Sequence, residues 1–186
     1  MSEPARQLLM DQRAVERALA RMAREIVERN EGTQNLVLLG IQRRGIPLAE
    51  RIAMEIERAE GERPPVGSLD ITLYRDDLMA IGPRPIVGET RLPPGGIDGR
   101  VVVIVDDVAY TGRTARAALD ELTDFGRPAR IYFCVLVDRG GRELPIQPDI
   151  VGRTVEAQSG QRVEVLVPEL DGRLAVELRL ADEGAA

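Results

Sequence analysis

Short apolar segments alternate with amphipathic ones through the first three quarters of the chain. Leu36–Ile41, Val101–Val105 and Ile131–Val137 are almost entirely apolar, as is typical of strands buried on both faces of a parallel sheet. Between them the sequence predicts helices over Pro47–Ala59 and Thr114–Phe125, since proline is tolerated in a first helical turn and a glycine follows the second segment. This order of strands and helices predicts an α/β fold around a parallel sheet with right-handed crossovers.

The segment before the first strand, residues 11–30, predicts an amphipathic helix that Asp11 caps. Its apolar residues recur at helical spacing, at Val15, Leu19, Met22 and Ile26. Another face carries an arginine at every third or fourth position, at Arg13, Arg17, Arg21 and Arg24. Two interpretations of this face remain open: a solvated surface with glutamates nearby, or a basic stripe that binds a polyanion.

The remaining segments predict a lid and a small cap. Val66–Tyr74 alternates apolar and polar residues and predicts a strand, and the long loop after it is rich in proline and glycine, which favours a lid or a disordered segment. Val163–Val167 and Leu174–Leu180 predict two short antiparallel strands. We expect a single domain with a core over about 11–137, a flexible lid over about 75–99 and a hood over about 138–180.

The composition restricts the chemistry. The 186 residues contain no histidine, which removes Ser-His and Cys-His nucleophiles and argues against a transition-metal site. The single Cys134 lies in an apolar run and is interpreted as a buried small hydrophobe. The net charge of −6 argues against broad nonspecific affinity for nucleic acid, although a local basic patch is compatible with it. Neither a signal pattern nor an apolar run of the roughly 20 residues of a membrane helix is found, so we expect a cytoplasmic protein without membrane contact.

The strongest chemical signal follows the second apolar strand. Asp106 and Asp107 stand at its end, where ligands bind in open α/β sheets. Thr111–Thr114 then supplies hydroxyls, accessible backbone amides and a cation at the start of a helix, a combination that favours a phosphate. Two acids would repel a bare phosphate, so their expected partners are ribose hydroxyls or a Mg²⁺ ion held by diphosphate oxygens. Walker and dinucleotide-binding glycine motifs are absent.

Residues 102–114, VVIVDDVAYTGRT, are similar to the phosphoribosyl-diphosphate signature of type I phosphoribosyltransferases. The variant DDVAYTGRT resembles that of the PyrR family, the bifunctional pyrimidine-operon regulators with uracil phosphoribosyltransferase activity. Other stretches resemble the same family: GIQRRGIPLA at 40–49, LDITLYRDDL at 69–78, GRPARI at 126–131 and VDRGGRELPI at 137–146. The resemblance runs from about residue 11 to residue 153.

The resemblance implies a type I phosphoribosyltransferase fold, with a central, mostly parallel sheet flanked by helices and a small antiparallel hood. It implies transfer from phosphoribosyl diphosphate to uracil, giving UMP and diphosphate, with Mg²⁺ as cofactor. The implied phosphoribosyl-diphosphate-binding residues are Val102, Val103, Ile104, Val105, Asp106, Asp107, Val108, Ala109, Tyr110, Thr111, Gly112, Arg113 and Thr114. The implied catalytic residues are Asp106, Asp107 and Arg44, and the two acids also face the Mg²⁺, mostly through ligand or water. The implied diphosphate-binding residues are Arg43, Arg44, Gly45 and Arg75, and those of the nucleotide-binding hood are Val137, Asp138, Arg139 and Ile150.

The family resemblance also implies a homodimer or larger homo-oligomer and UMP-dependent binding to the leader mRNA of the pyrimidine operon. The candidate RNA contacts are Arg17, Arg21, Arg24, Arg142 and Arg153. The chain departs from the family pattern with Arg43 in place of Thr, Gly141 in place of His and Gln147 in place of Arg, and with GRTVEAQ at 152–158 in place of the usual GKN-x-PTS stretch. Two alternatives therefore stay open. Catalysis could be retained with RNA recognition lost, or the protein could be a nucleotide-sensing regulator with little turnover or a transferase for another base.

Overall fold

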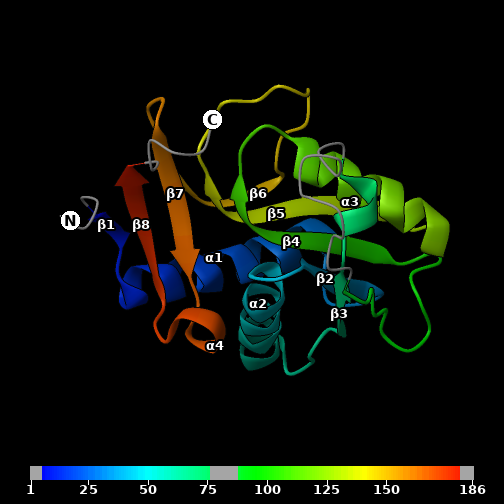
Figure 1. Ribbon diagram of the computed structural model, residues 1–186. Helices are drawn as coiled ribbons and strands as arrows, with labels where there is room; N and C mark the ends of the chain where they lie inside the picture. The colour runs from blue at the N-terminus through cyan, green and yellow to red at the C-terminus, as the bar shows by residue number, and fades with distance from the viewer. Residues whose placement is uncertain (1–5, 76–87, 181–186) are drawn as a thin grey trace.

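The computed structural model describes residues 6–75 and 88–180 and shows two sheets of different character (Figure 1). The larger sheet is parallel, with strand order β3-β2-β4-β5-β6, and the smaller one is antiparallel, with order β1-β8-β7. The strands of the larger sheet are β2 (Leu36–Ile41), β3 (Val66–Leu69), β4 (Val101–Ala109), β5 (Arg130–Asp138) and β6 (Ile150–Thr154). Those of the smaller sheet are β1 (Arg6–Met10), β7 (Gln161–Leu166) and β8 (Ala175–Leu180). The helices are α1 (Gln12–Asn30), α2 (Gly45–Glu60), α3 (Arg113–Phe125) and the single turn α4 (Pro168–Asp171), with a 3-10 turn at Thr72–Tyr74.

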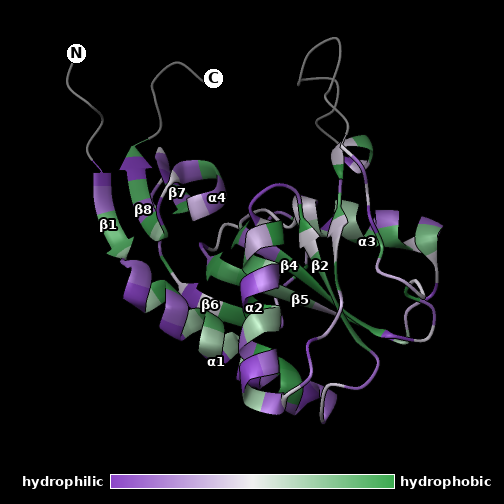
Figure 2. Cartoon of the chain, turned by 90° about the horizontal axis from the view of Figure 1, so that it is seen from below, coloured by the Kyte–Doolittle hydropathy of each residue, from purple (hydrophilic) through white to green (hydrophobic). Residues whose placement is uncertain are grey.

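Helices cover both faces of the parallel sheet, so its strands are apolar on both sides. In β2, Leu36 and Leu38 pack with α1 and α2, whereas Val37 and Leu39 pack with α3. Figure 2 shows hydrophobic residues along these central strands and hydrophilic residues on the outward sides of α1 and α2. Burying one such leucine contributes about 2 kcal/mol, so the two apolar layers hold the sheet between its helices.

Helix α1 forms as the sequence predicts. The amide of Ala14 donates to the Asp11 carboxylate at 2.8 Å, which satisfies one of the free N–H groups at the helix start. Leu19, Met22 and Ile26 are buried against the sheet. The helix therefore presents its other side, with the arginines, to solvent.

Several boundaries differ from the sequence prediction. Strand β3 ends at Leu69 and a 3-10 turn follows, because Asp70 accepts hydrogen bonds from the amide and hydroxyl of Thr72 and turns the backbone. Strand β4 does not end at its acids but continues to Ala109, where it still pairs with Asp138. Helix α2 begins two residues earlier than predicted, at Gly45.

The predicted hood has different members in the structure. Strand β6 pairs in parallel with β5, so Ile150–Thr154 belongs to the large sheet. The small sheet instead gains β1 from the N-terminal segment, which pairs with β8. A polar edge strand such as β6 and a five-residue strand such as β1 carry too little alternation to be recognised from sequence. The antiparallel pairing of β7 with β8 is confirmed.

The second half of the predicted lid is anchored to the sheet. The backbones of Ser68 and Arg91 exchange two hydrogen bonds of 2.9 Å, and Ile97 is buried beside α3. The remaining part, residues 76–87, lies outside the described residues. None of the helices in the described ranges has the length and apolar character needed to cross a membrane.

Candidate phosphoribosyl-binding site

The candidate site lies where β2 and β4 end side by side. The register pairs Gly40 with Val105, so the turn after β2 lies next to Asp106. A side chain on Gly45 would place its Cβ 2.4 Å from the Val105 carbonyl oxygen, so only glycine permits this approach of the two backbones. The packing of β2 against β4 therefore brings Arg43 and Arg44 to the same edge as the two acids.

The two acids differ in their surroundings. Asp106 is buried and Asp107 is half-buried. Each carboxylate accepts a hydrogen bond from the backbone amide of the next residue. The Asp107 amide donates to Asp106 Oδ1 and the Val108 amide donates to Asp107 Oδ1, both at 2.8 Å. Burial, and then the charge of Asp107, raise the pKa of Asp106 well above its usual range. Hydrogen-bond donors or a cation arriving at this edge would relieve the repulsion that the structure builds in.

The phosphate-type loop has the geometry expected from its sequence. Gly112 precedes α3 with a φ of 92°, in the left-handed region that glycine adopts without strain. The first amides of α3 point into the loop without intrahelical partners, as at every helix start. Thr111 accepts a hydrogen bond from the Arg113 amide at 3.3 Å and so helps to shape the turn.

A segment from the chain after β5 braces this loop. The amides of Glu143 and Leu144 donate to the Thr111 carbonyl at 2.9 and 3.0 Å, and the Glu143 carboxylate pairs with Arg113 at 2.8 Å. Arg142 donates to the carbonyls of Tyr110 at 2.7 Å and Ile146 at 2.9 Å. The loop therefore owes its shape to residues some thirty positions later in the chain as well as to its own glycine.

The Tyr110 ring lies between two features of that segment. The Arg139 guanidinium carbon lies 3.8 Å from the ring centroid, which is cation–π geometry. A Cβ on Gly141 would lie 2.5 Å from Tyr110 Cε2. The ring thus occupies the space that a side chain at position 141 would need in this arrangement.

The two arginines after β2 have different environments. Arg43 is exposed and forms no ion pair with the described residues. Arg44 pairs with Asp171 of α4 at 2.9 Å and is about one-third exposed. Burial would raise the pKa of Asp171, but the hydrogen bonds from the Val167 amide and Arg44 outweigh it and lower that pKa. Arg44 therefore ties the loop after β2 to the small sheet, while Arg43 is available to a ligand.

The structure brings some of the predicted hood residues to the site and buries others. Asp138 and Arg139 lie at the carboxyl end of β5, and the Arg139 amide donates to the Ala109 carbonyl at 3.1 Å. Val137 and Ile150 are fully buried in the core, so only their backbone could meet a ligand. Arg75 follows the 3-10 turn at an exposed position.

The predicted RNA-contacting arginines also separate into two groups. Arg17 and Arg24 are exposed on α1 and form no hydrogen bond or ion pair within the described part of the chain. The other three are engaged: Arg21 donates to the Val151 and Gly152 carbonyls, Arg153 donates to the Leu9 carbonyl, and Arg142 is 13% exposed in the loop brace. Only the first group presents free guanidinium groups to solvent.

The sequence assigned no role to two acids of this region, Glu143 and Asp171. Glu143 lies in the stretch 137–146 that resembles the family, and Asp171 lies outside every such stretch. Their partners Arg113 and Arg44 lie 30 and 127 positions away, so no local pattern could have paired them. The site is also not the largest hollow of the molecule, since the cavity beside Asp106 and Thr114 measures about 110 Å³.

Comparisons with known proteins agree with this geometry. The phosphoribosyl transferase domain family matches residues 7–169. The bifunctional protein PyrR of Thermus aquaticus is 59% identical over 170 residues, covering 91% of this chain and 93% of its own. The PyrR of Roseiflexus sp. is 56% identical over 164 residues, covering 88% and 89%. Among solved structures, a hypoxanthine phosphoribosyltransferase from Trypanosoma cruzi has the same fold, with a TM-score of 0.73 at 19% identity over 98% of both chains. The chain therefore belongs to the phosphoribosyltransferase family and, within it, to the bifunctional PyrR proteins.

Proposed function

We propose that this protein transfers the phosphoribosyl group from phosphoribosyl diphosphate to uracil, forming UMP and diphosphate. The observation that carries the proposal is the meeting, at one sheet edge, of Asp106 and Asp107, the start of α3 and the arginine-glycine turn after β2. These parts match the three parts of the donor, which are a ribose diol, a 5-phosphate and a diphosphate. The identity to PyrR proteins supports uracil as the acceptor.

The proposed roles follow from charge and position. Asp106 and Asp107 accept hydrogen bonds from the ribose hydroxyls, and the loop from Tyr110 to Thr114 surrounds the 5-phosphate with amides and hydroxyls. Arg43 receives the departing diphosphate, Gly45 lets the turn after β2 approach the backbone of β4, and Arg44 holds the turn through Asp171. The residues position and stabilise charge without forming a covalent intermediate, which agrees with the absence of histidine.

The acids also fit a Mg²⁺ ion that arrives with the donor. Mg²⁺ prefers oxygen ligands and keeps several of its waters, and the described residues contain no group of three metal-binding side chains. Asp106 and Asp107 would therefore hold the ion with water and donor oxygens completing its shell. When bound, the ion neutralises the negative charge that develops on the leaving diphosphate.

The regulatory half of the proposal is UMP-dependent binding to the leader mRNA of the pyrimidine operon. Arg17 and Arg24 lie on one side of α1 with their guanidinium groups free, as phosphate contacts require. Arg21 and Arg153 would contribute charge from fixed positions, whereas Arg142 serves the loop brace. We infer the same partner for this chain as for the family because Arg17 and Arg24 remain unpaired, among the described residues, on a protein that is acidic as a whole.

One assay tests the enzymatic half. The full chain is incubated with phosphoribosyl diphosphate, Mg²⁺ and either uracil or hypoxanthine, and nucleotide products are separated by chromatography. We expect UMP with uracil and no nucleotide with hypoxanthine. Product with hypoxanthine alone would show another base specificity, and no product with either base would refute catalysis.

A further inference from the structure

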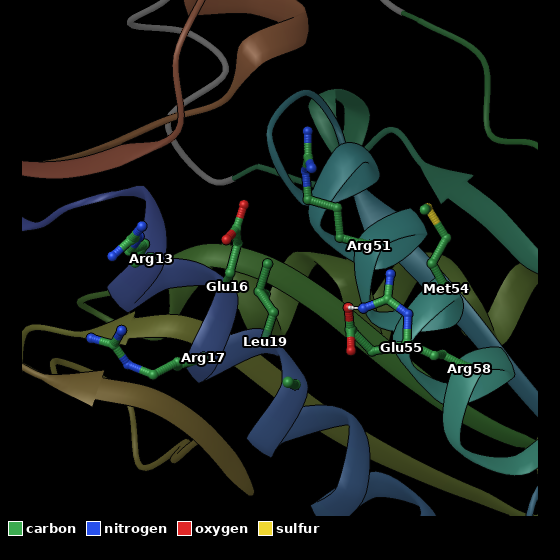
Figure 3. Close-up of a pocket in the computed structure, with 9 residues that line it drawn as sticks. Arg13, Glu16, Arg17, Leu19, Arg51, Met54, Glu55 and Arg58 are labelled. Atoms are coloured by element: carbon green, nitrogen blue, oxygen red, sulfur yellow. Dashed lines mark hydrogen bonds and ion pairs between the residues drawn. The ribbon is translucent and has the colours of Figure 1, made fainter.

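A groove between α1 and α2 lies outside the site described so far. It encloses about 550 Å³ and is bordered by Arg13 and Arg17 from α1 and by Arg51 and Arg58 from α2 (Figure 3). Leu19 forms part of its apolar floor and Met54, 46% exposed, part of its α2 side. Figure 3 shows Leu19 between the arginines of α1 and those of α2, with Met54 on the far side of Arg51 and Arg58 in this view.

The net charge of the groove lining is positive, whereas that of the whole chain is negative. Its four arginines face two glutamates, Glu16 and Glu55, so the lining carries a net charge of +2 (four minus two) on a protein of net charge −6. Arg58 pairs with Glu55 at 2.8 Å and Arg51 with Glu169 of α4 at 2.9 Å, which fixes the positions of both side chains. Arg13 and Arg17 are exposed and unpaired within the described residues.

Length and shape indicate a polymer as the occupant. Arg13, Arg17 and Arg24 follow one side of α1 and span about 16 Å at the rise of an α-helix, more than a single nucleotide covers. The groove joins this stripe and adds an apolar floor framed by guanidinium groups. Single-stranded RNA presents phosphates beside unstacked bases, which bind to such combinations of cations and flat or apolar surfaces.

We propose that the α1–α2 groove binds a single-stranded segment of the leader RNA, with its phosphates on the four arginines and a base over the exposed Met54. This inference rests on the RNA-binding half of the proposed function. It adds a second wall, from α2, to the free arginines of α1.

Replacing the α2 arginines tests the groove. Wild type, Arg51→Gln, Arg58→Gln and the double variant are titrated with the leader transcript in the presence of UMP at several salt concentrations. Each lost phosphate contact should make the slope of log K against log salt shallower by about 1 and weaken binding most at low salt. Arg63→Gln is the matched control, because Arg63 pairs with Glu50, which lies on another side of α2. This variant should change neither the salt slope nor the RNA affinity.

The outcomes separate the two proposals. A double variant that binds like Arg63→Gln, while the wild type binds tightly, overturns the groove and leaves the regulatory function standing. A wild type that does not bind the leader transcript overturns both, and the transferase assay is unaffected by either result.

A cross-link supplies an independent measurement. Cys134 is buried, and burial raises the pKa of its thiol, so Met54→Cys introduces the only accessible thiol of the described residues. With a thiol-linked aryl azide at position 54 we expect a cross-link to the leader transcript, or a loss of RNA affinity caused by the label itself. The same label at Arg127→Cys, an exposed position after α3, should give neither. A labelled position 54 that leaves RNA affinity intact and forms no cross-link overturns the proposal.

Discussion

We propose anion binding at both the phosphate-type loop and the α1–α2 groove, and the two are built by different means. The loop runs through consecutive residues, from Asp106 to Thr114, and most of the groups proposed to bind the ligand are backbone amides and short side chains. The groove is assembled from two helices, and its cations are long arginine side chains. Short, braced groups suit one small ligand in one geometry, whereas exposed arginines suit the repeated phosphates of a polymer. The two regions also meet: α4 supplies Asp171 to Arg44 at the loop after β2 and Glu169 to Arg51 at the groove.

The largest effect is expected at the loop. Asp107→Asn removes a charge that orients the ribose, so kcat/KM for phosphoribosyl diphosphate should fall by about 100-fold, the loss typical of one positioned polar group. Because Asp107 is half-buried, thermal unfolding should change little. Glu143→Gln is the control: it weakens the half-exposed pair with Arg113 and should cost severalfold at most. Equal rates for Asp107→Asn and wild type would contradict the assigned role.

A smaller effect, on RNA alone, is expected at α1. Arg17→Gln combined with Arg24→Gln removes two free cations, so leader-RNA affinity should fall about tenfold at low salt and the salt slope should lose about 2. UMP synthesis should continue at the wild-type rate, because neither residue lies at the sheet edge. If the double substitution left the salt dependence intact, the stripe on α1 would be a solvated face only.

Breaking the ion pair between α4 and α2 is expected to change the coupling between UMP binding and RNA binding by a few-fold. Glu169→Gln releases Arg51 while leaving the Arg44–Asp171 pair in place, so the ratio of RNA affinities with and without UMP should shrink by about fivefold. The reciprocal measurement is UMP affinity with and without RNA, which must change by the same factor. Glu62→Gln is the control and should leave the ratio unchanged, because among the residues that the structure describes the Glu62 carboxylate bonds only to Thr33. An unaltered ratio in Glu169→Gln would show that the two regions act independently.

The smallest effect is on stability, at a buried acid remote from both regions. Burial raises the pKa of Glu121, whose carboxylate accepts a hydrogen bond from Thr90. The folded state therefore binds this proton more tightly than the unfolded chain, and stability falls as pH rises through the raised pKa. Glu121→Gln keeps an acceptor without the charge, so its melting temperature should exceed wild type by about 3 °C at pH 8 and match it near pH 4. Calorimetry at both pH values checks this, with the exposed Glu28→Gln as reference. A gain of equal size at the two pH values would exclude the charge as the cause.

The sequence alone predicted the features of this protein that depend on neighbouring residues. The apolar segments at β2, β4 and β5 and the cap at Asp11 predict their elements because hydrophobic periodicity and capping act between near neighbours. The two acids and the threonine-glycine-arginine turn predict a phosphate site because strand end, loop and helix start are consecutive. That is why the fold class and the phosphate loop follow from the residues alone.

The tertiary structure decided everything that depends on distant partners. It placed the Arg142 guanidinium against the Tyr110 carbonyl, paired Arg44 with Asp171, and joined β1 to β8. It also placed Arg51 and Arg58 opposite the α1 stripe, which no spacing in the sequence indicates. A side chain's helix face follows from its period, but whether that face meets solvent, an acid or another helix follows only from the packing of the whole chain.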